Sequence, residues 1–180
     1  GLAKSGAEAY TIDQSLRFND GDSAYLGRTF SGGDTTEWTF SCWVKRGNNV
    51  ADGVSSSQKI FGAYIDSSNV SDINFSTGDV MDISEYVSGS TVGRLITDQV
   101  FRDPSAWYHI VVVWDSDNGT SGDRYRLYVN GDRVTDFSTE TQPSSAQASA
   151  TNAAGTHNVG KQNTDEYYDG YLAEMHFIDG

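Results

Sequence analysis

The sequence predicts an all-β protein, an antiparallel sandwich of two β-sheets of the jelly-roll kind. Three observations support this prediction. About ten to twelve short runs of β-branched and aromatic residues alternate with turn-forming stretches. Aromatic residues make up 12% of the chain, and 19 glycines supply its turns. No segment shows the apolar periodicity of a helix, and 180 residues suffice for one domain with a continuous core.

The first half of the chain predicts an N-terminal arm, a series of short strands and one long loop. Residues 1–14 are small and polar and form the arm, so the sandwich domain is expected to span residues 15–180. Residues 46–58 are rich in Asn, Ser and Gly and predict a polar loop. Strands are expected over residues 15–19, 24–30, 37–45, 59–66, 72–76, 80–86 and 92–101.

The run from Glu37 to Lys45 illustrates how alternation identifies the buried face of a strand. Trp38, Phe40, Cys42 and Val44 occupy every second position and therefore point to one side. The single cysteine cannot form an intrachain disulfide, and we interpret it as a small buried hydrophobic residue. It lacks a recognisable catalytic signature with His or Asn, so a nucleophilic role is not expected.

The strongest strand signal lies between Trp107 and Gly131. The run Trp-Tyr-His-Ile-Val-Val-Val-Trp-Asp ends at Asp115, and turn formers occupy residues 116–123. A second run, Tyr-Arg-Leu-Tyr-Val, leads to Asn130-Gly131, which is a strong signal for a tight hairpin. The chain therefore turns back on itself twice, as in an antiparallel meander.

The last third of the chain predicts one long loop and two further strands. Residues 133–137 extend the preceding strand, and residues 138–155 are of low complexity and predict an exposed loop. Strands resume over residues 156–160 and 168–179. Alternation in the last run places four side chains on one face, namely Leu172, Glu174, His176 and Ile178. Because the chain ends directly after this strand, we expect it to be a domain of a longer protein.

Five of these motifs, taken in order, resemble laminin G-like domains with the concanavalin A-like lectin fold. They are Ser15–Phe18 with its hairpin partner, Trp38–Lys45, Trp107–Gly131, Thr156–Gly160 and Asp169–Met175, and they span most of residues 15–180. The sequences of several of these motifs are similar to those in structural proteins of marine bacteriophages, tail fibres especially. In one departure, Ala173 stands where many relatives have Asp, which puts any cation or polar network through that position in doubt.

The resemblance implies a non-enzymatic module of a virion or similar extracellular assembly. Its partners would be glycans of a host cell surface, or other virion or fibre subunits, and it would work as a homo-oligomer or within a larger assembly. An alternative is a purely architectural fibre or capsid-decoration protein without a ligand. Fold alone does not choose between these functions.

The charge of the chain excludes two classes of partner. Twelve basic against 25 acidic residues give a net charge of −13, which opposes binding to nucleic acids and to anionic membranes. No apolar run approaches the roughly 18 residues that a membrane span requires. We therefore expect neither a nucleic-acid partner nor membrane insertion.

A glycosidase is a third functional alternative, because the resemblance extends to laminarinase-type enzymes. Their catalytic strand carries Glu-x-Asp-x-x-Glu, and the nearest match here is Val80–Glu85. Asp82 and Glu85 could align with the last two carboxylates, but Val80 occupies the first position, so double displacement is not expected. We interpret both acids as ordinary surface residues and expect no enzyme.

The turn after Asp115 contains candidate metal ligands. Asp115, Asp117, Asn118 and Asp123 offer the oxygen ligands that calcium prefers, although the spacing is not that of an EF-hand. Turns are also rich in Asp and Asn for conformational reasons alone. Calcium is therefore a candidate here, and no cofactor is required. The spacing of the histidines, among them His109 and His176, predicts structural roles and no metal triad.

Aromatic side chains are the candidate sugar-binding residues. A ring stacked on the apolar face of a sugar, together with a few fixed polar groups, makes a shallow glycan site. The candidates are Trp43, Tyr128, Tyr167 and Tyr168. The competing interpretation places such rings in the core of the sandwich.

Overall fold

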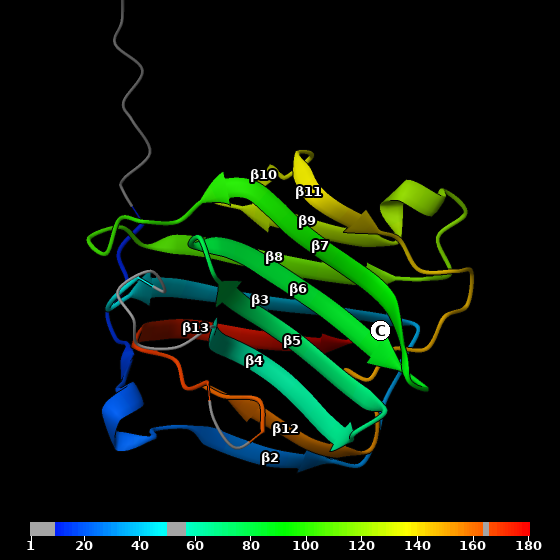
Figure 1. The fold of residues 1–180 in the computed structure, drawn as a ribbon, viewed down its shortest axis with the longest axis horizontal. Coiled ribbons are helices and arrows are strands. Elements are labelled where there is room, and N and C mark those ends of the chain that lie inside the picture. Colours follow the sequence, from blue (N-terminus) through cyan, green and yellow to red (C-terminus); the bar gives the residue numbers. More distant parts are fainter. Residues whose placement is uncertain (1–9, 50–56, 164–165) are drawn as a thin grey trace, which may run out of the picture.

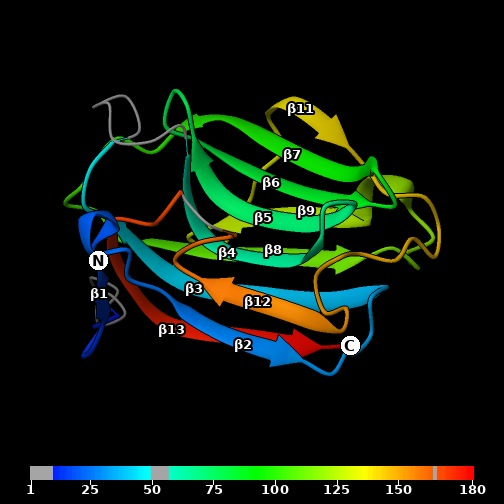
Figure 2. The ribbon, with the colours of Figure 1, turned by 60° about the horizontal axis from the view of Figure 1, so that its bottom comes forward.

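Two antiparallel sheets pack face to face, which confirms the predicted sandwich (Figures 1 and 2). The computed structural model describes residues 10–49, 57–163 and 166–180. Residues 1–9 of the predicted arm and residues 50–56 of the predicted loop lie outside the described residues. The helical elements among the described residues are short turns, η1 (Asp20–Asp22) and η3 (Ser121–Asp123). No helix in this part of the chain has the length and apolarity needed to cross a membrane.

Each sheet mixes strands from both ends of the chain. Six strands form sheet A, in the spatial order β1 (Leu16–Phe18), β13 (Gly170–Asp179), β3 (Glu37–Arg46), β8 (Tyr108–Asp115), β9 (Tyr125–Val129) and β10 (Asp132–Arg133). Seven strands form sheet B, in the order β11 (Phe137–Thr141), β7 (Ser90–Val100), β6 (Val80–Val87), β5 (Asn69–Ser76), β4 (Ser57–Asp66), β12 (Gly155–Val159) and β2 (Leu26–Phe30). The hairpin predicted from Trp107 to Gly131 is the pair β8–β9.

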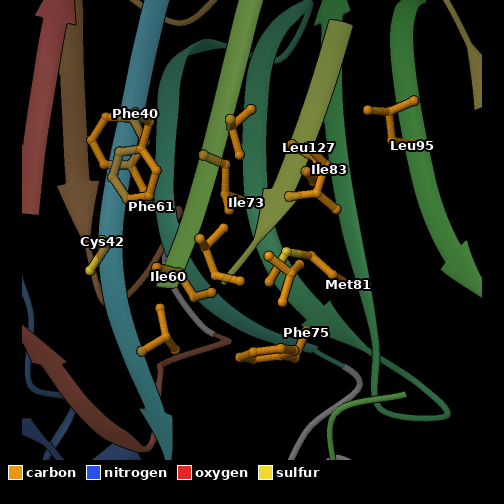
Figure 3. Packing of buried hydrophobic residues seen from close by; sticks show 14 of the residues in the cluster. Phe40, Cys42, Ile60, Phe61, Ile73, Phe75, Met81, Ile83, Leu95 and Leu127 are labelled. Atoms are coloured by element: carbon orange, nitrogen blue, oxygen red, sulfur yellow. The ribbon is translucent and has the colours of Figure 1, made fainter. Parts of the chain in front are cut away.

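The core forms where the alternating apolar residues of the two sheets meet (Figure 3). On β3, the predicted inward residues Trp38, Phe40, Cys42 and Val44 are at most 1% exposed. Phe40 of sheet A stacks on Phe61 of sheet B, with ring centroids 5.0 Å apart. Burial of one such aromatic side chain contributes about 2–3 kcal/mol to folding, so these contacts supply the main attraction between the sheets.

The buried thiol of Cys42 gives a direct test of the core. Burial raises the pKa of Cys42 to about 12, and the thiolate is the reactive form of cysteine. We expect a thiol reagent such as Ellman's reagent to leave the folded protein unmodified and to react fully after denaturation. Rapid reaction under native conditions would show that β3 is not packed as described.

The prediction of an exposed loop over residues 138–155 is wrong at both of its ends. The first residues form β11, which pairs with the edge of sheet B at β7, so residues 133–137 do not simply extend the preceding strand. Farther along, the segment 149–152 is buried against the end of the sandwich. Its low complexity concealed this burial, because Ser, Thr and Ala are small enough to pack there and their polar atoms find buried partners.

A β-bulge overturns the predicted alternation of the last strand. The register of β13 against β3 shifts between Ala173 and His176, and Glu174 adopts a left-handed φ of +47°. Leu172 therefore points into the core, whereas Glu174 and the residues that alternate with it lie on the outer surface. One extra residue in a strand reverses the faces of everything that follows it.

A buried ion pair joins the end of β3 to the turn between β5 and β6. Arg46 and Asp79 are 0% and 1% exposed, and Nη1 of Arg46 lies 2.9 Å from Oδ1 of Asp79. The same guanidinium donates to the carbonyl of Phe101 and lies over the ring of Phe75, 4.6 Å from its centroid. This network fixes the β5–β6 turn and, with it, one end of the outer face of sheet B.

Candidate functional site

A polar depression of about 420 Å³ lies on the outer face of sheet B, over β4, β5, β6 and β7. We call it the sheet B groove. Its charged and amide residues are Lys59, Asp72, Asn74, Asp82, Arg94 and Glu166. All except Glu166 stand on strands, and Glu166 belongs to the segment between β12 and β13.

Strand alternation directs these side chains outward. On β5, Ile73 and Phe75 are buried in the core, so Asp72 and Asn74 point away from it. On β6, Asp82 faces the groove in the same way, because its neighbours Met81 and Ile83 belong to the core. The same residues that build the hydrophobic core therefore set the positions of the polar groups on the opposite face.

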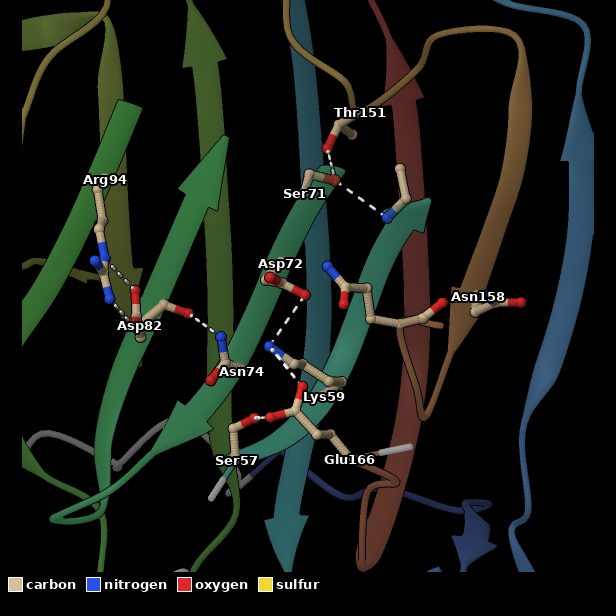
Figure 4. A network of polar contacts seen from close by, with 12 residues as sticks. Ser57, Lys59, Ser71, Asp72, Asn74, Asp82, Arg94, Thr151, Asn158 and Glu166 are labelled. Carbon is tan, nitrogen blue, oxygen red and sulfur yellow. Dashed lines mark hydrogen bonds and ion pairs between the residues drawn. The ribbon is translucent and has the colours of Figure 1, made fainter. Parts of the chain in front are cut away.

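Lys59 lies at one side of the groove between two carboxylates (Figure 4). Its Nζ is 3.2 Å from Oδ1 of Asp72 and 3.3 Å from Oε2 of Glu166, and its side chain is only 9% exposed. Burial raises the pKa of Asp72, and the neighbouring Lys59 ammonium lowers it. Ser57 adds a hydrogen bond by donating to Glu166, which ties the β12–β13 segment to β4.

Arg94 and Asp82 form the other charged pair of the groove. The guanidinium reaches the carboxylate with two nitrogens, Nε at 3.1 Å and Nη2 at 2.8 Å. This two-point geometry fixes both side chains more firmly than a single contact does. The side-chain amide of Asn74 donates to the backbone carbonyl of Asp82, and this hydrogen bond fixes the Asn74 side chain at the bottom of the groove. The groove thus presents donors and acceptors in fixed positions.

Tyrosine rings and a lysine continue the outer face of sheet B beside the groove. A second depression, of about 260 Å³, includes Tyr25, Tyr64 and Lys161. Nζ of Lys161 lies 3.4 Å from the ring centroid of Tyr25 and 5.8 Å from that of Tyr167. We call these four residues the tyrosine patch. Tyr25 is 48% exposed and the other two rings are half-buried, so part of their apolar surface is accessible next to the polar groove.

Two glycines, Gly27 and Gly62, leave space above the outer face of this part of the sheet. Asn158 on β12 pairs with Gly27 on β2 and with Gly62 on β4. A Cβ atom at Gly27 would lie 2.9 Å from Oδ1 of Asn158, and one at Gly62 would lie 3.2 Å from Cγ of Gln162. The missing side chains leave the space in which Gln162 and the ring of Tyr25 sit.

The structure does not bring the four predicted sugar-binding residues together. Trp43 and Tyr128 are half-buried on the outer face of sheet A, where Trp43 stacks with Tyr10. Tyr167 lies on the opposite side of the sandwich in the tyrosine patch. Tyr168 is a correction, because its ring is fully buried against Phe18 and its hydroxyl donates to a backbone carbonyl. It has no surface to offer a ligand.

Asp82 and Glu85 lie on opposite faces of β6, so they cannot act on one glycosidic bond. Asp82 opens into the groove, whereas Glu85 is 1% exposed on the inner side. Its carboxyl group accepts hydrogen bonds from the amides of Ala150 and Thr151 and is hydrogen-bonded to the Thr151 hydroxyl. Our interpretation of Glu85 as a surface acid is therefore wrong, and its role is to hold the 149–152 segment.

Each acidic side chain of the β8–β9 turn has its own interaction partner. Asp115 pairs with Arg126, Asp123 pairs with Arg133, and Asp117 accepts a hydrogen bond from a threonine. The side-chain oxygen of Asn118 accepts a hydrogen bond from the backbone amide of Thr120, and its NH₂ group donates to Asp115. No group of three His, Cys, Asp or Glu side chains in the described part of the chain is arranged to hold a metal. Calcium at this turn stays a prediction, without a preformed ligand set there.

Sequence reasoning missed most of the groove. Lys59, Asp72, Asn74 and Arg94 stand at alternating polar positions, which is also the pattern of any solvent-facing strand. They could have been predicted from the unusually many charged and amide side chains on four consecutive strands, β4 to β7. Recognising this pattern requires the register that places these strands side by side.

Solved structures with the same fold include domains with bound sugars. Domain 4 of the arabinanase AbnA from Geobacillus stearothermophilus, in complex with arabinotriose, is 14% identical, with a TM-score of 0.61 over 97% of this chain and 78% of that one. The sialidase CBM40 of Ruminococcus gnavus, bound to α2,3-sialyllactose, is 10% identical, with a TM-score of 0.56 over 86% of this chain and 91% of that one. At these identities the likeness establishes the fold alone.

A viral protein is also among the similar structures. Tailspike protein 2 of the Escherichia coli O157:H7 bacteriophage CAB120 is 11% identical, with a TM-score of 0.60 over 92% of this chain. The matched region is 23% of the tailspike chain.

Comparison with curated protein sequences gives no match. A model of one sequence family does match, and it covers residues 12–180. By this match over nearly its whole length, the chain belongs to the concanavalin A-like lectin/glucanases superfamily.

Proposed function

We propose that this chain is a non-catalytic carbohydrate-binding module and that its binding surface is the outer face of sheet B. The observation that carries the proposal is the meeting, on one sheet face, of fixed polar pairs with one exposed and two half-buried tyrosine rings. Shallow glycan sites need both features, because the rings contact apolar sugar faces and the polar groups fix the hydroxyls. The sugar complexes of two domains with this fold support the same assignment.

A finer proposal concerns where the module works. We propose that it belongs to a virion or another extracellular assembly and contacts host-surface glycans. The likeness to a tailspike domain supports this placement, as does the resemblance of several sequence motifs to those of phage tail fibres. Detection of the chain in purified particles by mass spectrometry, and binding of the chain to intact host cells, would test it. Its absence from particles would contradict the placement and leave the glycan proposal standing.

The tyrosine patch gives the sharpest test of the proposed face. We expect Tyr167→Ala to weaken glycan binding about 5- to 10-fold, because one stacked ring contributes roughly 1 kcal/mol. Tyr128→Ala is the matched control, since it removes a half-buried tyrosine from the outer face of sheet A. A glycan array would identify a ligand, and isothermal titration calorimetry would then compare the variants.

The two variants also decide between the faces. A loss of affinity in Tyr128→Ala with none in Tyr167→Ala would move the binding surface to sheet A, where Trp43 also lies. The absence of binding to any glycan on a broad array would overturn the proposed function.

An architectural role is a second candidate, and apolar groups at one edge of the sandwich favour it. Leu16 on β1 and Leu26 on β2 are 57% and 52% exposed, and both line a depression between the edges of the two sheets. Unpaired edge strands with exposed apolar residues are places where other chains attach. Light scattering of the wild type and of Leu26→Ser would reveal a homo-oligomer that depends on this edge.

A further inference from the structure

We infer that the sheet B groove takes glycans without acidic groups, and that it disfavours sialylated, uronic or sulfated chains. This inference rests on the proposed function and names the ligand class of the same site. Two observations support it, namely the charge balance of the groove and the pairing of its cations with carboxylates.

The charge balance of the groove is negative. Its lining holds two cations, Lys59 and Arg94, and three acidic residues, Asp72, Asp82 and Glu166. The whole chain, the groove included, carries a net charge of −13. A carboxylate or sulfate on a sugar would enter against this field, and the low dielectric of a partly buried site strengthens the repulsion.

Both cations of the groove already hold carboxylates. Arg94 uses two nitrogens on Asp82, and Lys59 lies within 3.3 Å of two acidic residues. A sugar acid would have to displace one of these carboxylates and leave it partly buried without its partner, which is costly. Neutral hydroxyls face no such competition, because a hydroxyl accepts from the cation and donates to the carboxylate at the same time. The Arg94–Asp82 pair therefore suits two adjacent hydroxyls of one sugar ring.

The fold itself does not forbid acidic sugars, since the Ruminococcus gnavus domain binds sialyllactose. The discrimination is therefore assigned to the particular side chains of this groove. Lys161 does not alter the balance of the groove, because it belongs to the tyrosine patch and lies against the ring of Tyr25.

The test compares neutral glycans with the same chains carrying sialic acid or sulfate. On an array of such pairs, we expect the wild type to bind the neutral member at least about 10-fold more tightly, which corresponds to about 1.4 kcal/mol. Asp82→Asn removes the carboxylate that pairs with Arg94, which leaves the guanidinium free to bind an acidic sugar. The variant should therefore gain affinity for the acidic glycans, and the ratio of neutral to acidic affinity should fall at least threefold.

The control variant is Asp169→Asn, because the Arg17–Asp169 pair matches Arg94–Asp82 in exposure and lies outside the groove. The side-chain exposures are 43% and 9% in the control pair, against 43% and 10% in the groove pair. The control should keep the wild-type ratio, and thermal denaturation verifies that both variants are folded.

Two results would overturn the inference while leaving the proposed function intact. One is a wild-type preference for the acidic members, and the other is an unchanged ratio in Asp82→Asn. Failure to bind either class would overturn the proposed function and the inference together.

Discussion

Replacing Asp79 with asparagine is expected to destabilise the protein by about 3–5 kcal/mol. The substitution keeps the shape of the side chain and tolerates the left-handed φ of +63° at this position. It removes the negative charge that faces Arg46, whose side chain is 0% exposed. A buried cation without its partner carries the full cost of its desolvation. The free energy of unfolding from urea titration, monitored by tryptophan fluorescence, measures the effect.

A double variant separates the ion pair from other effects of the substitution. Arg46→Met combined with Asp79→Asn leaves no unpaired charge, so it should be more stable than Asp79→Asn alone. Arg102 also contacts Asp79, but its side chain is 61% exposed and the contact contributes little. A change of less than about 0.5 kcal/mol in Asp79→Asn, typical of surface sites, would contradict the structural role of this pair.

The same arginine shows how far alternation predicts this fold. The even-numbered residues of β3 were predicted to face the core, and they do. Arg46 continues this series, whereas the sequence predicts that the strand ends at Lys45 and that Arg46 begins the polar loop. The residue that makes its burial tolerable, Asp79, lies 33 positions away. Local pattern therefore predicts apolar burial, whereas a buried charge depends on a partner that only the tertiary structure supplies.

The candidate site was harder to predict than the core for a related reason. Apolar alternation describes one strand at a time, and it assigned the inner face of β3 correctly but not that of β13. The groove arises between strands, from side chains such as Lys59 and Arg94 that come together only through the register of β4 to β7. Tyr167 and Tyr168 are adjacent in the sequence and both were candidates, yet Tyr167 lies at the surface and Tyr168 in the core. The local sequence alone does not distinguish the two.

Glu85 is expected to make the protein less stable as the pH rises from about 5 to about 8. Burial raises the pKa of its carboxyl group from 4.5 to about 8, against hydrogen bonds from Thr151 and Ala150 that lower it. Because the pKa in the folded state lies above that in the unfolded state, the contribution to stability is complete below 4.5. It is then lost as the pH rises through 8, with a slope of at most about 1.4 kcal/mol per pH unit.

Other groups near Glu85 titrate in different ways, so a variant must isolate its contribution. Burial lowers the pKa of His157, which acts in the opposite direction because a buried neutral imidazole gains stability as the pH rises toward 6.5. Asp72 repels the Glu85 carboxylate and has its own pKa raised by burial. Tyr125, whose pKa is raised well above 10, stays neutral throughout the range.

Glu85→Gln is the informative replacement, because a neutral amide can keep the contacts of the protonated acid. Its oxygen can accept from the amides of Ala150 and Thr151, and its NH₂ group can donate to the Thr151 hydroxyl, which in turn donates to Ser71. We expect the variant to lose the decline in stability between pH 5 and 8 and to exceed the wild type at the upper end. Unfolding free energies at a series of pH values test this, and an identical slope in both proteins would show that Glu85 is ionised throughout the range in the folded state.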